Sequence, residues 1–288
     1  MLDLNFGSTI SVIDKSLSGH CNMTGTCARD LDVLTPENGI TLSYCPNQLR
    51  QRFFDVYKNN PEFLSVDAVL CLHATSLCEL YMPFQKPLII IASTRFDIGR
   101  YYDIESLRIW FSTLERIASN NSNILGARYN TIAANNMYDL QYIKYFTSID
   151  NVLYLPSTAS YLRGVRYEPC RPGWLVGPSR GVNGIIYKEM LDTIRNTTRD
   201  IRREEGIDLD LTPYHLNMPA LYHIRDIYPT YEFTDLAGHR GIVLIPYQVS
   251  LMSFFEYYRM GIPIIAPSAR LLSVWQVNYT VMNERTWD

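Results

Sequence analysis

The sequence lacks a long apolar run. No stretch approaches the ~20 consecutive apolar residues that a helix needs to cross a membrane, so we expect no membrane span. The first twenty residues also lack an apolar block behind a basic start, because Asp3, Asp14 and Lys15 are scattered through them. Such a beginning is not typical of a secretory signal. We therefore expect a protein of the cytoplasm.

An excess of positive charge is missing as well. The chain has 26 Lys and Arg against 29 Asp and Glu, which gives a formal net charge of −3 at pH 7. No basic stripe is visible along it. Because nucleic-acid binding needs clustered positive charge, we expect no nucleic-acid partner.

A metal-binding pattern of cysteines is missing too. None of the six cysteines has the pairing typical of a zinc site; they are Cys21, Cys27, Cys45, Cys71, Cys78 and Cys170. Cys71 and Cys78 have apolar neighbours in the sequence, so we expect them to be reduced core residues in a reducing compartment. No Ser/His/Asp or Cys/His triad suggests itself either.

The first half of the chain contains apolar segments that alternate between the residue spacing of strands and that of helices. The pattern predicts strands at 11–14, 67–72, 87–92, 130–134 and 152–155. It predicts helices at 47–59, 75–81, 104–118 and 137–146. Alternating strands and helices are typical of an open, mostly parallel sheet. We assign residues 1–160 to an N-terminal Rossmann-like domain.

The same pattern restarts after an irregular, proline-containing stretch, which we interpret as a linker over residues 161–172. It predicts strands at 173–176, 207–211, 230–233, 241–246 and 262–266, with helices at 185–203, 219–224 and 250–260. Residues 241–266 form one βαβ unit, whose two strands should be parallel. Residues 173–288 are therefore predicted to form a second doubly wound domain, and the fold class is α/β.

Ligands of such sheets bind beyond the carboxyl ends of the strands, which directs attention to two loops. Residues 177–184, GPSRGVNG, join a strand to a helix, where free amides can receive a phosphate and Arg180 can add a charge-assisted contact. The alternative is a turn that needs positive φ at Gly181 or Gly184. The stretch matches neither G-x-G-x-x-G nor a Walker loop.

The second loop leads into the helix predicted at 250–260. Ser253 and Glu256 have the spacing of a capping box, in which each side chain satisfies a backbone amide of the other. Alternatively, Ser250 and Ser253 hold a diphosphate while Glu256 accepts hydrogen bonds from a ribose. A capped helix N-terminus is itself an anion site, so the two interpretations are partly compatible.

Two candidate general bases follow the carboxyl ends of strands predicted in the first domain. His73 follows the strand predicted at 67–72, and its ordinary pKa lies near neutrality, although a lone histidine is more often structural. Asp97 follows the strand at 87–92 and is the main rival. Three further residues compete for the role: Asp14, His20 and Glu79.

Taken together, the restart at residue 173 and the two loops resemble the GT-B fold of nucleotide-sugar glycosyltransferases. Residues 174–184, WLVGPSRGVNG, resemble the opening strand and glycine-containing loop of the donor domain in that family. Residues 245–268 resemble its later segment, where a strand ending in proline precedes a helix with Ser and Glu. This second segment is also similar to glycosyltransferases of algae and of the large DNA viruses that infect them, and distantly to exostosin-like enzymes.

The resemblance implies two Rossmann-like domains that face each other across a cleft, with the donor on the C-terminal one. It implies that Arg180 meets the donor phosphates, Ser250 and Ser253 the diphosphate, and Glu256 the ribose. The candidates to flank the nucleobase of the donor are Tyr214, His215 and Tyr231. The expected donor-binding set also includes Gly177, Ser179 and Tyr247. His73 or Asp97 would then serve as catalytic base from the other domain.

The expected function is transfer of a sugar from a nucleoside-diphosphate donor, a UDP-sugar by first choice, to a hydroxyl of a glycan acceptor. We expect an inverting enzyme that needs no metal and no cofactor, in the host cytoplasm if the chain is viral. One alternative is an epimerase-like enzyme or a binding protein for nucleotide sugars. Another is a metal-dependent transferase that uses Asp208 and Asp210, whose D-x-D spacing resembles a metal site of other glycosyltransferases; Asp30 and Asp32 repeat it.

Overall fold

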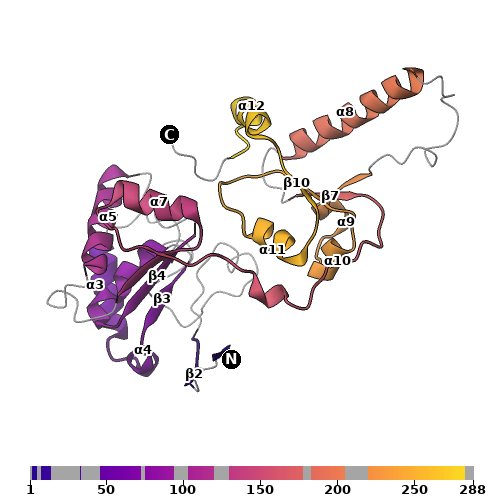
Figure 1. Cartoon of the computed structure of the whole chain (residues 1–288). Coiled ribbons are helices and arrows are strands. Elements are labelled where there is room, and N and C mark those ends of the chain that lie inside the picture. Colours follow the sequence, from indigo (N-terminus) through magenta and orange to yellow (C-terminus); the bar gives the residue numbers. More distant parts are fainter. Residues whose placement is uncertain are drawn as a thin grey trace. The chain divides into compact units, whose positions relative to one another are not determined.

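The structure is a computed structural model of the 288-residue chain. It describes residues 2–4, 8–13, 33, 46–72, 75–93, 103–119, 130–177, 183–204 and 220–282. The chain divides into two compact units, Met1–Pro156 and Ser157–Asp288 (Figure 1). No helix in the described ranges is long and apolar enough to cross a membrane. Both units are built on parallel strands, as the α/β prediction requires.

Unit 1 contains a four-stranded parallel sheet of order β3-β4-β5-β6. Its strands are Val69–Cys71, Leu88–Ala92, Thr131–Ala134 and Leu153–Tyr154. The connecting helices are the 3₁₀ helix η1 at Thr75–Phe84, α5 at Ile104–Ala118 and α7 at Met137–Phe146. All seven elements fall on segments that the hydrophobic spacing predicts, although η1 is a 3₁₀ helix and runs on to Phe84.

Short-range capping explains where the two long helices of unit 1 begin. Asp103 caps α5, and its carboxylate accepts from the Glu105 amide at 3.2 Å and the Ser106 hydroxyl at 2.7 Å. Asn136 caps α7 through a 2.9 Å bond from the Asp139 amide. Both caps leave the apolar stripe of their helix free to pack on the sheet.

The two faces of the unit 1 sheet differ in burial. Leu88, Ile90 and Ala92 of β4 lie at most 1% exposed in one cluster with residues of η1, α5 and α7. On the other face, Leu70 pairs in register with Ile89, and Leu70 is 54% exposed. Leu153 of β6 is 51% exposed on that same face. The connecting helices therefore pack on the face that carries Leu88, Ile90 and Ala92.

A second core in unit 1 surrounds Phe53. It joins α3 (Pro46–Tyr57), α4 (Pro61–Ser65) and η1, and Phe53 is completely buried among aromatic rings. The unit also has an antiparallel pair, β1 (Leu2–Leu4) with β2 (Ser8–Ile10). The strand predicted at 11–14 is thus wrong for residues 11–13, which follow β2 without regular structure.

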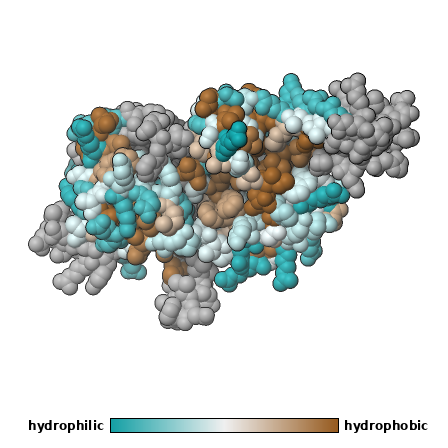
Figure 2. Space-filling model, turned by 45° about the horizontal axis from the view of Figure 1, so that its top comes forward, coloured by the Kyte–Doolittle hydropathy of each residue, from teal (hydrophilic) through white to brown (hydrophobic). Residues whose placement is uncertain are grey.

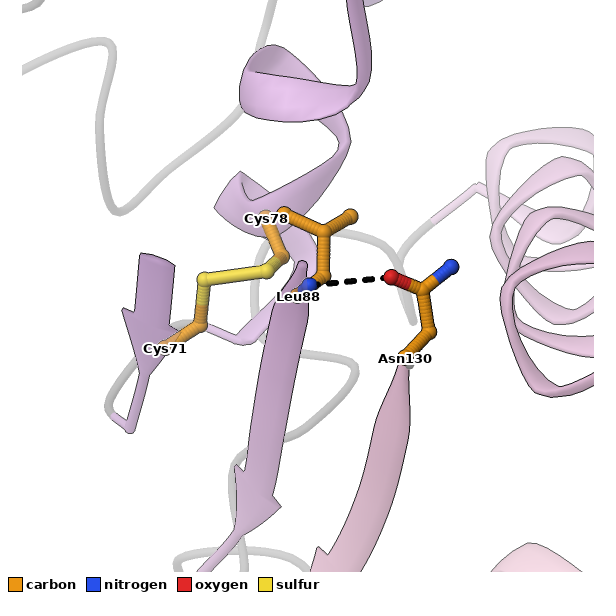
Figure 3. The surroundings of a disulfide bond; sticks show 4 residues. All are labelled: Cys71, Cys78, Leu88 and Asn130. Carbon is orange, nitrogen blue, oxygen red and sulfur yellow. Dashed lines mark hydrogen bonds between the residues drawn. A yellow bond between two sulfur atoms is a disulfide. The ribbon is translucent and has the colours of Figure 1, made fainter. Parts of the chain in front are cut away.

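Cys71 and Cys78 form a disulfide, which corrects the prediction of two reduced cysteines (Figure 3). Their Cα atoms are 5.8 Å apart, and the bond ties the end of β3 to the first turn of η1. The two cysteines are seven positions apart in the sequence, and their Cα separation lies in the usual range for a disulfide. Nearby, the side-chain oxygen of Asn130 accepts from the Leu88 amide at 2.9 Å and joins the starts of β4 and β5.

Unit 2 contains a second four-stranded parallel sheet, of order β10-β9-β7-β8. In chain order its strands are β7 (Trp174–Gly177), β8 (Leu221–His223), β9 (Ile242–Leu244) and β10 (Ile264–Ile265). Its helices are η2 (Ser160–Leu162), α8 (Asn183–Glu204), α9 (Ile224–Ile227), α10 (Phe233–Ala237), α11 (Met252–Met260) and α12 (Ala269–Tyr279). The parallel pairing predicted within residues 241–266 is confirmed, since β9 and β10 are parallel neighbours.

Helices cover both faces of this sheet. Leu175 of β7 packs in a cluster with α10, α11 and η2, whereas Val176, the next residue, packs with α8 and α12. Both side chains are 0% exposed. Because successive strand residues point to opposite faces, unit 2 is doubly wound.

The stretch predicted as a linker packs on unit 2. Ala159 and Leu162 are 4% and 2% exposed in the cluster that includes Leu175. Further on, the Tyr167 amide donates to the carbonyl of Met260 at 3.0 Å. Residues 157–172 therefore form part of the second compact unit, and the division of the chain falls after Pro156.

Two predicted elements of unit 2 have the wrong type. Residues 221–223, predicted as helix, form the strand β8, because pairing with β7 outweighs their local preference. The strand predicted at 230–233 does not form either, and α10 begins at Phe233. A reciprocal capping box between Glu232 and Asp235 starts that helix. The strand predicted at 207–211 lies outside the described residues.

Candidate functional site

The strand order of unit 2 creates a topological switch point. β7 lies between β8 and β9, so the chain leaves β7 toward one edge of the sheet and later continues on the other side. At the carboxyl end, Gly177 is in register with Leu244, and the Ile245 amide donates to the Gly177 carbonyl at 3.2 Å. The loops that leave β7 and β9 therefore start side by side, as in sheets that bind ligands in this crevice.

The loop after β9 is anchored at both ends. Ile245 is 0% and Leu251 is 5% exposed, whereas Val249 between them is 40% exposed. Within the loop, the side-chain amide of Gln248 donates to the Ser250 carbonyl at 2.6 Å. Tyr247 packs against the core cluster of unit 2. The predicted donor residues Tyr247 and Ser250 are thus both carried by a loop at the switch point.

Helix α11 begins differently from the prediction. Its N-cap is Leu251, which provides no side-chain hydrogen bond, so Ser253 is already the second helical residue and the predicted capping box is absent. Glu256 makes a different contact, with its Oε1 accepting a hydrogen bond from the hydroxyl of Tyr161 in η2. Glu256 is therefore available as a carboxylate group rather than used as a cap.

Ser253 lies against Tyr257, the residue that anchors α11 to the core. Tyr257 is 2% exposed, and burial raises the pKa of its phenol, while the Ser253 hydroxyl lowers it in part. The phenol consequently stays protonated at neutral pH. Ser253 itself is half-buried. The structure thus places Ser253 and Glu256 on the same helix, directly after the loop that carries Ser250.

Gly177 ends β7 for a packing reason. A Cβ atom at this position would lie 2.5 Å from Cδ1 of Ile224 in α9, so a larger residue would require the Ile224 side chain to move. Gly184 already belongs to α8, and its φ is not positive, which excludes it as the predicted left-handed turn. The hydroxyl of Tyr187 donates to the Leu221 carbonyl at 3.0 Å and fixes the start of α8 on the sheet.

A polar network lies at the opposite, amino-terminal edge of the same sheet. Arg171 donates to the Tyr228 hydroxyl and to the Asp235 carboxylate, the latter at 2.9 Å. Tyr228 in turn contacts Nε2 of His239 at 2.8 Å. His239 is 3% exposed, and burial together with the nearby Arg171 charge lowers its pKa. Open α/β sheets commonly bind ligands at the opposite, carboxyl-terminal edge, so we interpret this network as structural.

Several predicted site residues lie outside the described residues. They are the candidate bases His73 and Asp97, the donor candidates Ser179, Arg180, Tyr214 and His215, and the metal candidates Asp208 and Asp210. The strands that precede the two bases, β3 and β4, are neighbours in the sheet and end at Cys71 and Ala92. The roles of these residues remain predictions.

Two contacts, one in each unit, are not indicated by the sequence pattern. Tyr161 is 95 residues from Glu256 and lies in a stretch predicted as linker. The Cys71–Cys78 bond follows the edge strand of unit 1, and apolar neighbours alone made both cysteines look like reduced core residues.

No protein-family model, curated protein or solved structure gives a significant match to the chain.

Proposed function

We propose that this protein is a glycosyltransferase of GT-B type. It moves a sugar from a nucleoside-diphosphate donor to a hydroxyl of a glycan acceptor, without a metal and with inversion. In this proposal the two units face each other across a cleft, unit 2 binds the donor, and unit 1 contributes the acceptor side.

One observation carries the proposal: the switch point at the carboxyl ends of β7 and β9. There the glycine-containing stretch 177–184 and the loop of residues 245–251 leave adjacent strands, and helices α8 and α11 follow them. Amides at the start of α8 would face a diphosphate, which the helix dipole favours. Glu256 on α11 supplies a carboxylate for ribose hydroxyls. The described strands of unit 1 follow chain order, so they contain no switch point of this kind.

The chemistry assigned to these groups is a single displacement. The acceptor oxygen attacks the anomeric carbon, the bond from that carbon to the donor phosphate oxygen breaks, and the nucleoside diphosphate leaves with the bonding electrons. Arg180 and the amides of unit 2 would stabilise the negative charge that develops on the leaving group. The acceptor hydroxyl gives its proton to a base, for which His73 and Asp97 remain the candidates.

A calorimetric screen tests the donor half of this proposal. The full-length chain is titrated with UDP, GDP and ADP, and with the corresponding sugar nucleotides, in buffer with EDTA. We expect one nucleotide series to bind, and we expect Arg180→Ala to weaken it about tenfold because a charged contact to phosphate is lost. If no member binds, the proposal is wrong.

Product analysis tests the transferase half. Each sugar nucleotide that binds is incubated with and without a mixture of glycan acceptors, and the products are separated by mass. Transfer should require the acceptor and should survive EDTA. An altered sugar nucleotide formed without acceptor would instead indicate an epimerase, and loss of activity with EDTA would indicate the metal-dependent alternative.

A further inference from the structure

Tyr161 is exposed, but the backbone that carries it is anchored. Its neighbours Ala159 and Leu162 are 4% and 2% exposed, and they pack in the same cluster as Tyr257 and Met260 of α11. Tyr161 itself is 62% exposed. The segment thus presents a phenol beside α11 from a fixed position.

The turn before Tyr161 is conformationally unfavourable. Ala159 has φ 45° and ψ 42°, in the left-handed region that residues with a Cβ atom rarely adopt. Strained backbone of this kind persists only where its surroundings hold it, and it occurs often at functional sites. Ser157, just before it, donates to the sulfur of Met252 at 3.5 Å and adds a second tie to α11.

The phenol is bonded to one oxygen of Glu256. Its hydroxyl donates to Oε1, and among the described residues Oε2 accepts no hydrogen bond. Partial desolvation of its hydroxyl raises the pKa of Tyr161, and the bond to Glu256 raises it further, so the phenol remains a donor at neutral pH. An ionised carboxylate can accept at both oxygens. One oxygen of Glu256 is therefore fixed from within the protein, while the other can accept from a ligand.

We propose that Tyr161 is a positioning residue for nucleotide binding: it fixes the Glu256 carboxylate through Oε1 so that Oε2 accepts a hydroxyl of the donor ribose. The inference rests on the proposed function, because it assigns Glu256 to the ribose of a nucleoside diphosphate. Tyr161 touches no substrate. Its effect is to hold the carboxylate in the binding orientation before the ligand arrives, which removes an ordering cost from binding.

A calorimetric comparison of Tyr161→Phe with wild type tests this role. The ligands are whichever of UDP, GDP and ADP binds wild type, and its 2′,3′-dideoxy form, which has no ribose hydroxyl to donate. The variant should bind the ribonucleotide about fivefold more weakly and the dideoxy form as wild type does. In turnover, the donor KM should rise by a similar factor while kcat stays unchanged.

Two further variants separate positioning from a merely structural effect. Glu256→Ala should lose the preference for the ribonucleotide, and adding Tyr161→Phe to it should change nothing more. Tyr258→Phe is the matched control, because Tyr258 is an exposed tyrosine of α11, 75% exposed, at which the same hydroxyl is removed. It should bind both nucleotides as wild type does, and all variants should melt at the wild-type temperature.

The outcomes distinguish the two proposals. If wild type binds a nucleotide and Tyr161→Phe binds it equally well or more tightly, Tyr161 does not position Glu256, and the proposed function stands. Equal weakening of both nucleotides would also overturn the role, because the ribose hydroxyls would not be involved. If wild type binds none of the nucleotides, the proposed function fails and the role of Tyr161 fails with it.

Discussion

The two sheets have four strands each but are wound differently. In unit 1 the strands follow chain order, β3-β4-β5-β6, so each right-handed connection returns on the same side and covers the same face. In unit 2 the order β10-β9-β7-β8 reverses direction at β7, which places helices on both faces. Only the second arrangement contains a topological switch point, the position at which open α/β sheets commonly bind ligands. This difference supports the proposal that unit 2 binds the donor.

The largest expected effect is on stability, when side chains on the two faces of each sheet are truncated to alanine. In unit 1, Ile90→Ala should lower the free energy of unfolding by about 3–4 kcal/mol, because Ile90 is 1% exposed beneath the helices. Leu70→Ala should cost less than about 1 kcal/mol, because Leu70 is 54% exposed. Guanidinium unfolding followed by circular dichroism measures both.

The matching pair in unit 2 provides the comparison. Leu175 and Val176 lie on opposite faces of β7, and both are 0% exposed. Leu175→Ala and Val176→Ala should therefore both destabilise the protein by about 2 kcal/mol or more. A small cost for either one would mean that unit 2 is also covered on a single face, and the contrast between the units would be lost.

The disulfide gives the second largest expected effect, confined to unit 1. Reduction of the Cys71–Cys78 disulfide should lower the free energy of unfolding by about 2–3 kcal/mol, since the bond restricts the unfolded chain. The double variant Cys71→Ser, Cys78→Ser should melt at the same temperature with and without reductant. Cys170→Ser is the control, because Cys170 is free and exposed. An equal response of wild type and the double variant to reductant would contradict the bond.

Hydrophobic spacing predicted the helices and strands that bury a continuous stripe. The helices at 104–118 and 137–146 have the predicted bounds, because their apolar residues repeat at the helical period and Asp103 and Asn136 cap them. The parallel pairing of β9 and β10 followed from the length of the connection between them.

Features that depend on tertiary contacts were not predictable in this way. β8 is a strand because β7 offers it a parallel partner, although residues 221–223 have no strand-like alternation. Tyr161 reaches Glu256 only because residues 157–162 fold back on α11, and a capping-box spacing suggested a different partner for Glu256. For the candidate site, sequence reasoning therefore found the loops at the switch point but not the contacts among their side chains.

A glycine substitution sharpens the account of unit 2 at a smaller scale. A Cβ atom on Gly241, which precedes β9, would lie 2.3 Å from the Trp174 ring and 2.7 Å from the Pro263 carbonyl oxygen. Gly241→Ala should thus cost about 2 kcal/mol, since neither neighbour can move without shifting a strand. Gly184→Ala is the matched control: no atom lies within 4 Å, and alanine should keep or improve the stability of α8. Thermal unfolding of both variants checks this, and equal melting temperatures would contradict the close packing at β9.

The smallest expected effect is a pH dependence of unit 2 from the network at its amino-terminal edge. Arg171 donates a hydrogen bond to the Tyr228 hydroxyl. That hydroxyl can in turn donate to Nε2 of His239 only when the imidazole is neutral. Burial lowers the pKa of His239 from 6.5, so between the two values the unfolded chain binds more protons than the folded one. Stability from His239 is therefore complete above pH 6.5 and is lost as the pH falls below it.

His239→Gln separates this contribution from the carboxylates. The variant should flatten the fall in melting temperature below pH 6.5, the ordinary value from which burial lowers the pKa of His239. Asp235 acts lower: its pKa is reduced from 3.8, first by the backbone bond to Glu232 and then by Arg171, so its share is lost only below that value. A wild-type unit 2 that gains stability relative to the variant on acidification would mean that His239 prefers the charged form, and the direction of proton donation through Tyr228 would have to be reversed.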